Sequence, residues 1–191
     1  KEDLEKIGKV HVVALNLTQI SSHYSEFLAG VHIPKFDRKM GGGALMDMNI
    51  YNINFCVSLF GQPEKITYLP TIQHDTDTSG ILNLSYDDKQ ASLIAAKDAV
   101  GPTRSYIEGE KGLIYFDGPL NVLPDYYVQI GKEEAKRYNF NKYSHRMISE
   151  FNYFAQKIKN HDQQAADEAY EHSLNAIIVL EKAQEFLPKN D

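Results

Sequence analysis

The fold is decided by the stretch GGGALMDMNIYNIN, which occupies residues 41–54. Three glycines followed at once by mixed apolar and polar residues predict a tight backbone approach leading into a helix. The apolar residues of the helix repeat at helical spacing and form one stripe, which consists of Met46, Ile50, Ile53 and Val57. The pattern predicts a helix over about residues 44–60, ended by Gly61 and Pro63.

The polar residues of this helix share a neighbouring face, because Asp47, Tyr51 and Asn54 are spaced at i, i+4 and i+7. Burial of a carboxylate and a phenol without partners is costly, so we expect them to face a polar pocket or a ligand. The helix N-terminus after the glycines also favours an anionic group. The alternative is a flexible glycine loop, with Asp47 placed in the first turn for the helix dipole and Tyr51 in the core.

Apolar runs on both sides of this helix predict strands. Residues 10–17 are dense in Val, Ala and Leu, which predicts a strand buried on both faces. Residues 18–40 are expected to form an irregular excursion, a feature that is often functional or mobile. Period-two alternation and turn residues then predict strands within residues 64–75, 82–86, 91–98, 106–108, 113–116, 126–130 and 135–140, with hairpin turns at 109–112 and at Gly131.

Two helices close the chain, each with apolar residues at helical spacing. The first stripe consists of Met147, Phe151, Phe154 and Ile158. The second stripe consists of Ala176, Leu180, Ala183 and Leu187.

The order of these elements predicts an α+β fold, with a mainly antiparallel open sheet and helices packed on one face. The other sheet face is then solvated or meets a partner, so we expect a homo-oligomer, such as a dimer, formed through it. At the start of the chain, residues 1–9 are typical of the last turn of a helix stopped by Gly8. Such an opening fits either a piece of a longer protein or a trimmed terminus.

The composition excludes several classes of protein. The 191 residues, of which 42% are hydrophobic and 24% charged, predict one globular domain. A net charge of −6 without a basic cluster argues against nucleic-acid binding, and polar residues interrupt the longest apolar stretch, which argues against a membrane span. The single cysteine, Cys56, fits a reducing, cytoplasmic location. The histidines show no metal-ligand spacing, so no metal site is expected.

Residues 41–51 also match a known pattern, GGG-[AS]-L-x-D-x-G-x-[HY], except at Asn49. Three further segments fit the same family in order and spacing: the junction at residues 7–10, the hairpin at 106–114 and the helix at 143–158. Over nearly its whole length the chain resembles the C-terminal domain of Gfo/Idh/MocA oxidoreductases. Tyr51 in place of His resembles the branch of glucose–fructose oxidoreductase and dihydrodiol dehydrogenase.

The resemblance implies an NAD(P)-dependent oxidoreductase of two domains that acts on a sugar, inositol or diol. Residues 1–191 would form the single C-terminal domain for substrate binding and oligomerisation, and an N-terminal Rossmann domain would bind NAD or NADP. The family's glycine-rich nucleotide motif and its Glu-Lys-Pro lysine lie upstream, and this sequence contains neither. The fragment by itself is therefore expected to be inactive.

The resemblance also implies roles for particular residues. Asp47 would accept a hydrogen bond from a substrate hydroxyl or relay a proton, and Tyr51 would exchange a proton with the reacting oxygen. Asn49 and Asn54 replace the family's usual Gly and Asp and would contact substrate.

Two further pairs of residues carry weaker expectations. Tyr143 and His145 would line the substrate pocket, against an ordinary surface or core role. Arg38 and Lys39 would reach the cofactor phosphate or the substrate, against a place in a solvated charged loop.

Two other classes of function remain open. The first is a non-catalytic regulator or ligand sensor on the same scaffold, as occurs in a yeast repressor of this family. The second is a stand-alone dimeric module, in which Asp47 and Tyr51 would pair with each other and no cleft would lie near the glycines.

Overall fold

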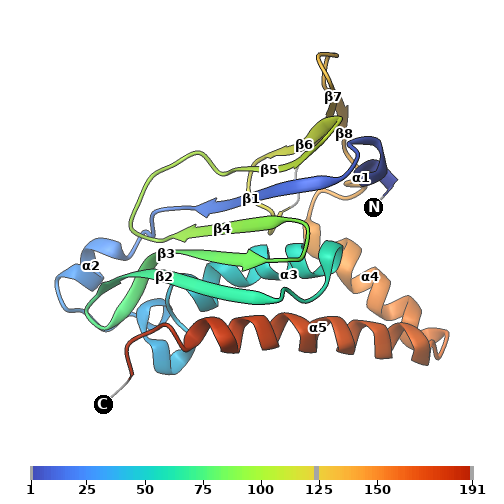
Figure 1. Ribbon diagram of the computed structural model, residues 1–191. Helices are drawn as coiled ribbons and strands as arrows, with labels where there is room; N and C mark the ends of the chain where they lie inside the picture. The colour runs from blue at the N-terminus through green and yellow to red at the C-terminus, as the bar shows by residue number, and fades with distance from the viewer. Residues whose placement is uncertain (1, 123–124, 190–191) are drawn as a thin grey trace.

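The computed structural model describes residues 2–122 and 125–189, whose strands form one open sheet (Figure 1). The strand order is β2-β3-β4-β1-β5-β6-β7-β8. The strands are β1 (Val10–Thr18), β2 (Lys65–Gln73), β3 (Thr76–Ser85), β4 (Gln90–Ala96), β5 (Arg104–Gly109), β6 (Gly112–Asp117), β7 (Tyr126–Ile130) and β8 (Lys136–Tyr138). The helices are α1 (Glu2–Lys6), α2 (Tyr24–Leu28), α3 (Ile50–Phe60), α4 (Arg146–Lys159) and α5 (Gln163–Gln184).

The sheet is mainly antiparallel, as predicted. The exception is the central pair, in which β1 runs parallel to β4 with Thr18 beside Ala96. The carboxyl ends of these two strands therefore meet at the same edge of the sheet. The excursion of residues 19–43 begins at this edge, and Lys97, the residue after β4, lies there too.

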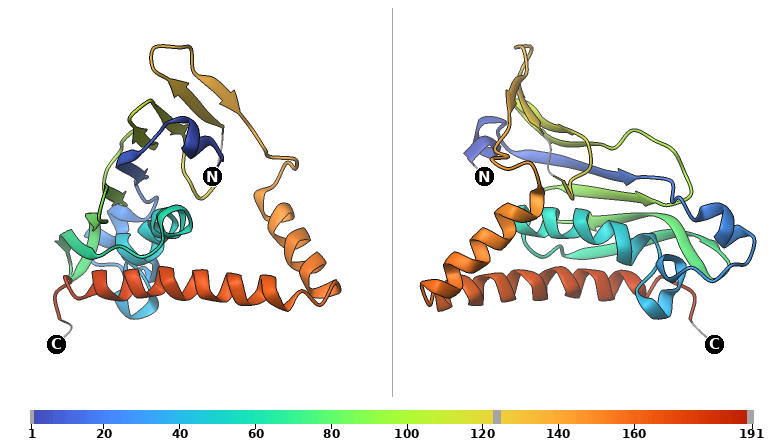
Figure 2. Two further views of the ribbon diagram at one scale, coloured as in Figure 1. Left: turned by 45° about the vertical axis from the view of Figure 1, so that its right-hand side comes forward. Right: turned by 180° about the vertical axis from the view of Figure 1, so that it is seen from behind.

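The core lies between one face of the sheet and the layer formed by α3 and α5 (Figures 1 and 2). Alternate residues of the strands, such as Leu15 and Leu93, are fully buried against Ile53 of α3 and Val179 of α5. The order of strand, helix, antiparallel strands and two closing helices is the one on which the α+β prediction was based, and that fold class is confirmed.

The opposite face of the sheet carries no helix in the described residues (Figure 2). Val12 points to this side and is 44% exposed, so the prediction that the first strand is buried on both faces was wrong. The dense run of Val, Ala and Leu in β1 reflects its central position in the sheet, between β4 and β5, and not helices packed on both faces of the sheet. Tyr115 and Tyr127 stack here with ring centroids 4.7 Å apart.

The hairpin of β2 and β3 is longer than predicted, because β3 begins at Thr76 rather than at Leu82. Its two-residue turn consists of His74 and Asp75, which both have positive φ angles of 45° and 60°. Such turns usually contain Gly or Asn, and the absence of both hid this one in the sequence. The hairpins at 109–112 and at Gly131 were predicted correctly, although β8 is shorter than the predicted strand.

The predicted helix at residues 44–60 is present but begins irregularly. Leu45–Asn49 form a π-helical turn, labelled η3, and regular α-helix follows only from Ile50. The excursion before it holds α2 and the short 3₁₀ turns Pro34–Phe36 and Arg38–Met40. A π turn is wider than an α turn, so the assumed regular stacking of residues 47 and 51 does not hold in detail.

The penultimate helix, α4, leans away from the sheet and contacts the rest of the domain through α5 (Figure 2). Its apolar stripe, predicted to face a core, stays uncovered by the described residues: Phe151 is 66% exposed, and Phe154 and Ile158 are also exposed. The apolar residues do lie on one side of α4, as predicted, but no described residues cover that side.

We predict that the two faces of β3 respond differently to truncation. Leu82→Ala removes a fully buried side chain from the core, so it should lower the free energy of unfolding by about 2–5 kcal/mol. Ile81→Ala, on the uncovered face next to it, should cost less than about 1 kcal/mol in a dilute monomer. Urea unfolding measures both values, and equal costs would contradict the one-sided core.

Candidate functional site

The three glycines allow the chain to pass close to its own backbone. A Cβ on Gly42 would lie 2.6 Å from the Asp37 nitrogen and 2.8 Å from the Lys35 oxygen. Gly43 has a φ of 103°, and a Cβ there would collide with a carboxylate oxygen of Asp77. The expected close approach is therefore present, and its partners are segment 35–37 and the start of β3.

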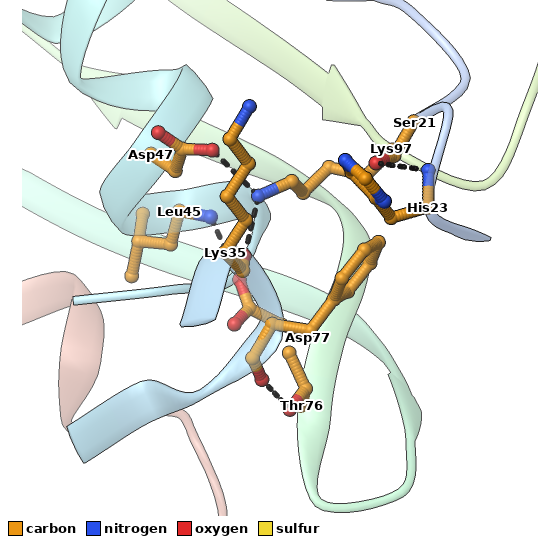
Figure 3. A network of polar contacts seen from close by, with 9 residues as sticks. Ser21, His23, Lys35, Leu45, Asp47, Thr76, Asp77 and Lys97 are labelled. Carbon is orange, nitrogen blue, oxygen red and sulfur yellow. Dashed lines mark hydrogen bonds and ion pairs between the residues drawn. The ribbon is translucent and has the colours of Figure 1, made fainter. Parts of the chain in front are cut away.

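Asp77 supplies the anionic group expected at the start of this helix. Its Oδ2 accepts a hydrogen bond of 2.7 Å from the Leu45 backbone N–H and one of 2.8 Å from the Tyr68 hydroxyl. Asp77 is almost fully buried, and this burial raises the pKa of its carboxyl, while the two hydrogen bonds oppose the rise. One of the first backbone N–H groups of the helix, that of Leu45, is thus paired from within the domain (Figure 3).

Asp47 pairs with a lysine that the sequence analysis did not single out. The Nζ of Lys97 lies 2.6 Å from Asp47 Oδ2 and donates a second hydrogen bond, also of 2.6 Å, to the Lys35 carbonyl oxygen (Figure 3). It also lies 4.9 Å from the centroid of the Phe36 ring. The Lys97 side chain is only 4% exposed and that of Asp47 is 43% exposed, so Asp47 links a buried cation to the surface.

The backbone holds Lys97 in place at the carboxyl edge of the central strands. Its N–H donates to the Thr78 oxygen and its carbonyl accepts from the Ser21 N–H, both at 2.8 Å. Lysine after a strand of small apolar residues, ASLIAA, was the available signal in the sequence. The parallel pairing of β1 and β4, which the sequence did not reveal, is what brings this position beneath the glycine segment.

Tyr51 lies in the first turn of α3 and is 41% exposed. Within the part of the chain that the structure describes, its hydroxyl makes no hydrogen bond, and Asp47 pairs with Lys97 instead of with Tyr51. The internal Asp47–Tyr51 pair of the stand-alone alternative is therefore not formed. A carboxylate and a phenol are both available to a ligand on the same helical segment.

Asn49 and Asn54 make contacts inside the domain. Asn49 is fully buried; its Nδ2 donates to the Leu93 oxygen at 3.1 Å and its Oδ1 accepts from Asn52 at 2.9 Å. Asn54 donates to the Ile50 oxygen of its own helix at 2.8 Å. These contacts join the helix to β4 and cap a helical carbonyl, and a role of either residue toward substrate stays a prediction.

Arg38 and Lys39 lie on a surface pocket of about 490 Å³ that is also lined by Phe36, His74 and Pro188. Arg38 Nη1 donates to the Pro188 oxygen at 2.9 Å, which ties the excursion to the end of the chain. Lys39 is exposed. A contact of either side chain with a cofactor phosphate also stays a prediction.

Tyr143 and His145 precede α4, which begins toward the C-terminal end of α3 (Figure 1). His145 is the N-cap of α4, with Nδ1 accepting from the Met147 N–H at 3.3 Å, and Tyr143 is exposed. Neither contacts Asp47 or Tyr51 within residues 2–122 and 125–189. Those residues also contain no cluster of three or more His, Cys, Asp or Glu side chains suited to a metal ion.

Together these features define a class of α+β domain, in which exposed polar groups start a helix that is packed on one face of an open sheet. The chain belongs to the GFO/IDH/MocA C-terminal domain family, which residues 4–115 match. Among the described residues, no helix has the length and apolar character needed to cross a membrane.

Two curated proteins are similar to the chain in sequence. The scyllo-inositol 2-dehydrogenase (NADP(+)) IolU of Bacillus subtilis is 28% identical over 187 residues, which cover 96% of this chain and 56% of IolU. The uncharacterized oxidoreductase YgjR of Escherichia coli is 28% identical over 118 residues, covering 61% of this chain and 36% of YgjR. The chain thus spans about half the length, or less, of these relatives.

Solved structures share the fold at low sequence identity. KijD10, a 3-ketoreductase from Actinomadura kijaniata in complex with TDP-benzene and NADP, aligns with a TM-score of 0.74 and 16% identity over 96% of this chain and 54% of its own. The aldose-aldose oxidoreductase from Caulobacter crescentus, complexed with glycerol, aligns with a TM-score of 0.64 and 16% identity over 84% of this chain and 51% of its own.

We predict that the glycines differ in their tolerance of a side chain. Gly41 and Gly43 both have positive φ angles, but only Gly43 faces a neighbouring atom within 4 Å. Gly41→Ala should cost about 1–2 kcal/mol of backbone strain. Gly43→Ala should cost about 1.5–3 kcal/mol more, because it also displaces the Asp77 carboxylate from the Leu45 N–H. Chemical denaturation of both variants measures the difference, and equal costs would remove Asp77 from this role.

Proposed function

We propose that the chain is the substrate-facing domain of an NAD(P)-dependent oxidoreductase that interconverts a hydroxyl and a carbonyl group on a sugar, inositol or related diol. The observation that carries this proposal is the exposed pair of Asp47 and Tyr51 at the start of one helix, with Asp47 held by a buried lysine. Membership of the family and the similarity to IolU, an NADP(+)-dependent inositol dehydrogenase, support it.

The dinucleotide is expected to bind mainly to an N-terminal Rossmann domain of the full-length protein. The present sequence has no G-x-G-x-x-G motif, and the Arg38 guanidinium is already engaged by the Pro188 carbonyl. Arg38 and Lys39 would add a contact to the cofactor phosphate or the substrate rather than form a dinucleotide site by themselves. When bound, the nicotinamide would accept or donate the hydride at the reacting carbon.

The residues of this chain would handle the hydroxyl group and its proton. The oxygen of Asp47 that is not bonded to Lys97 would accept a hydrogen bond from a substrate hydroxyl and so orient the reacting carbon. Tyr51 would donate its phenolic proton to the carbonyl oxygen in reduction and take it back in oxidation.

The exposed stripe of α4 supports the presence of a second domain. Phe151, Phe154 and Ile158 would be covered by the Rossmann domain, which would also close the substrate cleft over Asp47 and Tyr51. On this proposal residues 1–191 are the single C-terminal domain of the protein, and the fragment alone is inactive. The buried, unpaired thiol of Cys56 supports a reducing, cytoplasmic location.

We predict that Tyr51→Phe in the full-length protein lowers turnover by about a hundredfold or more, because a positioned acid is lost. The assay screens sugars, inositols and vicinal diols with NAD and NADP and follows absorbance of the reduced nicotinamide. Tyr170→Phe is the matched control, because it removes an exposed hydroxyl far from the site. The end of α5 near the site is marked by the contact of Gln184 with Met46. Tyr170 lies 14 residues, or about 21 Å of helix, before Gln184.

Two outcomes would contradict the enzymatic proposal in different ways. Unchanged turnover in Tyr51→Phe would remove this residue from the chemistry. Binding of the dinucleotide by the wild-type protein without turnover of any substrate would support the regulatory alternative instead.

The proposal includes a homo-oligomer formed through the uncovered sheet face. Val12, Leu69 and Ile81 are exposed apolar residues on the strands, and a hollow of about 760 Å³ lies between Ile94 and Tyr106. Exposed apolar surface of this kind marks a contact with another protein.

We predict that Ile81→Asp separates the oligomer into monomers, because it places a charge in the centre of the apolar contact. Analytical ultracentrifugation of the full-length protein measures the mass. Leu174→Asp, on the exposed side of α5, is the control and should leave the mass unchanged. A wild-type protein that is monomeric at micromolar concentration would contradict the proposed interface.

A further inference from the structure

We propose that Lys97 is a positioning residue of this active site, which fixes the orientation of Asp47 toward the substrate. The inference rests on the proposed oxidoreductase function and adds a residue to it. Lys97 lies 50 positions after Asp47 in the chain and comes from the sheet rather than from the helix.

The ammonium group of Lys97 is fully engaged inside the domain. It donates to Asp47 Oδ2 and to the Lys35 oxygen, each at 2.6 Å, and it lies over the ring of Phe36. Of the three hydrogens of the ammonium, two are used in these hydrogen bonds, and the ring of Phe36 covers a further side of the group. The side chain is only 4% exposed. Lys97 therefore has no free face for a substrate, and any effect on the reaction passes through Asp47.

The same cation holds two walls of the site together. The Lys35 carbonyl that it binds also accepts the Gly43 N–H at 3.1 Å, and Gly42 packs on this carbonyl. The excursion, the glycines and Asp47 are thus joined at one point (Figure 3). If Lys97 is removed, the Asp47 carboxylate loses its anchor and can rotate into solvent.

Stability alone does not explain a lysine at this position. Burial of a charge is expensive even when the charge is paired, and apolar residues of similar size often replace buried ion pairs without loss of stability. The pair is also asymmetric, with a buried cation and a half-exposed carboxylate. This asymmetry suits a carboxylate that Lys97 holds through one oxygen, while the other oxygen stays available to a ligand.

The chain offers a matched control at the opposite end of the same strand. Lys89 precedes β4, pairs with Asp88 and lies 5.4 Å from the centroid of the Phe60 ring. It has the same combination of carboxylate and aromatic neighbours as Lys97, but it lies at the other end of β4 from Asp47. Lys89→Met therefore reports the loss of a comparable ion pair outside the site.

The test is a double-mutant cycle in the full-length enzyme with Lys97→Met and Asp47→Asn. We expect Lys97→Met to lower kcat about tenfold to a hundredfold, the scale of a misplaced catalytic group, and Lys89→Met to leave kcat within about twofold. In the Asp47→Asn background, Lys97→Met should have less than about a twofold further effect, because the residue it positions is already altered. Lys97→Arg, which keeps the charge, should recover part of the lost kcat.

Three results would overturn parts of this scheme. Losses from Lys97→Met and Asp47→Asn that multiply independently would show a general structural role and overturn the positioning role. A Lys89→Met variant that loses as much kcat as Lys97→Met would do the same. Absence of turnover in the wild-type enzyme with every substrate screened would overturn the proposed function, and this inference with it.

Discussion

The hydrogen bond from the Leu45 N–H, at the start of the helix that carries Asp47, to the Asp77 carboxylate is the constraint on which the candidate site depends. Asp77 belongs to β3, so the contact fixes where the helix begins relative to the sheet. Only glycine at position 43 leaves room for it. Asp77 pairs with Leu45 at the start of the helix, whereas Asp47 pairs with Lys97 and stays 43% exposed.

The parallel pairing of β1 with β4 has a second effect on the site. In a wholly antiparallel sheet, the ends of neighbouring strands alternate between the two edges. Here two carboxyl ends meet, and both are polar: β1 ends at Thr18, and Lys97 directly follows β4. The excursion after β1 then folds back over Lys97, which becomes buried although it lies at the edge of the sheet.

The fold could largely be predicted from the sequence because its signals are local. The alternation in β3 and β4, the glycine hairpin turn between β5 and β6, and the apolar stripe of α3 each occupy a few neighbouring residues. The turn at His74 and Asp75 was missed because it contains neither Gly nor Asn, the residues that usually mark a two-residue hairpin turn, although His and Asp can adopt positive φ angles. The π turn at Leu45–Asn49 was missed because no residue pattern distinguishes it from an α turn.

The site was predicted less completely, because its contacts join residues far apart in the chain. Asp47 and Tyr51 were predicted as site residues from the spacing within one helix and from the family resemblance, and their roles stay predictions. Lys97 and Asp77 lie about 50 and 30 residues from them, and only the strand order places them beside the helix. Burial of Asn49 likewise depends on Leu93 of β4, which a helical pattern cannot reveal.

The sheet is a single layer with two faces of different character, and this has a consequence for the geometry of assembly. One face is packed against α3 and α5 (Figure 2). The other face carries the stacked rings of Tyr115 and Tyr127. A molecule that binds the tyrosine side cannot compete sterically with one that binds at Asp47. On the proposed function, subunit contacts and ligand contacts would lie on opposite sides of the sheet, so substitutions on one side would alter one kind of contact without the other.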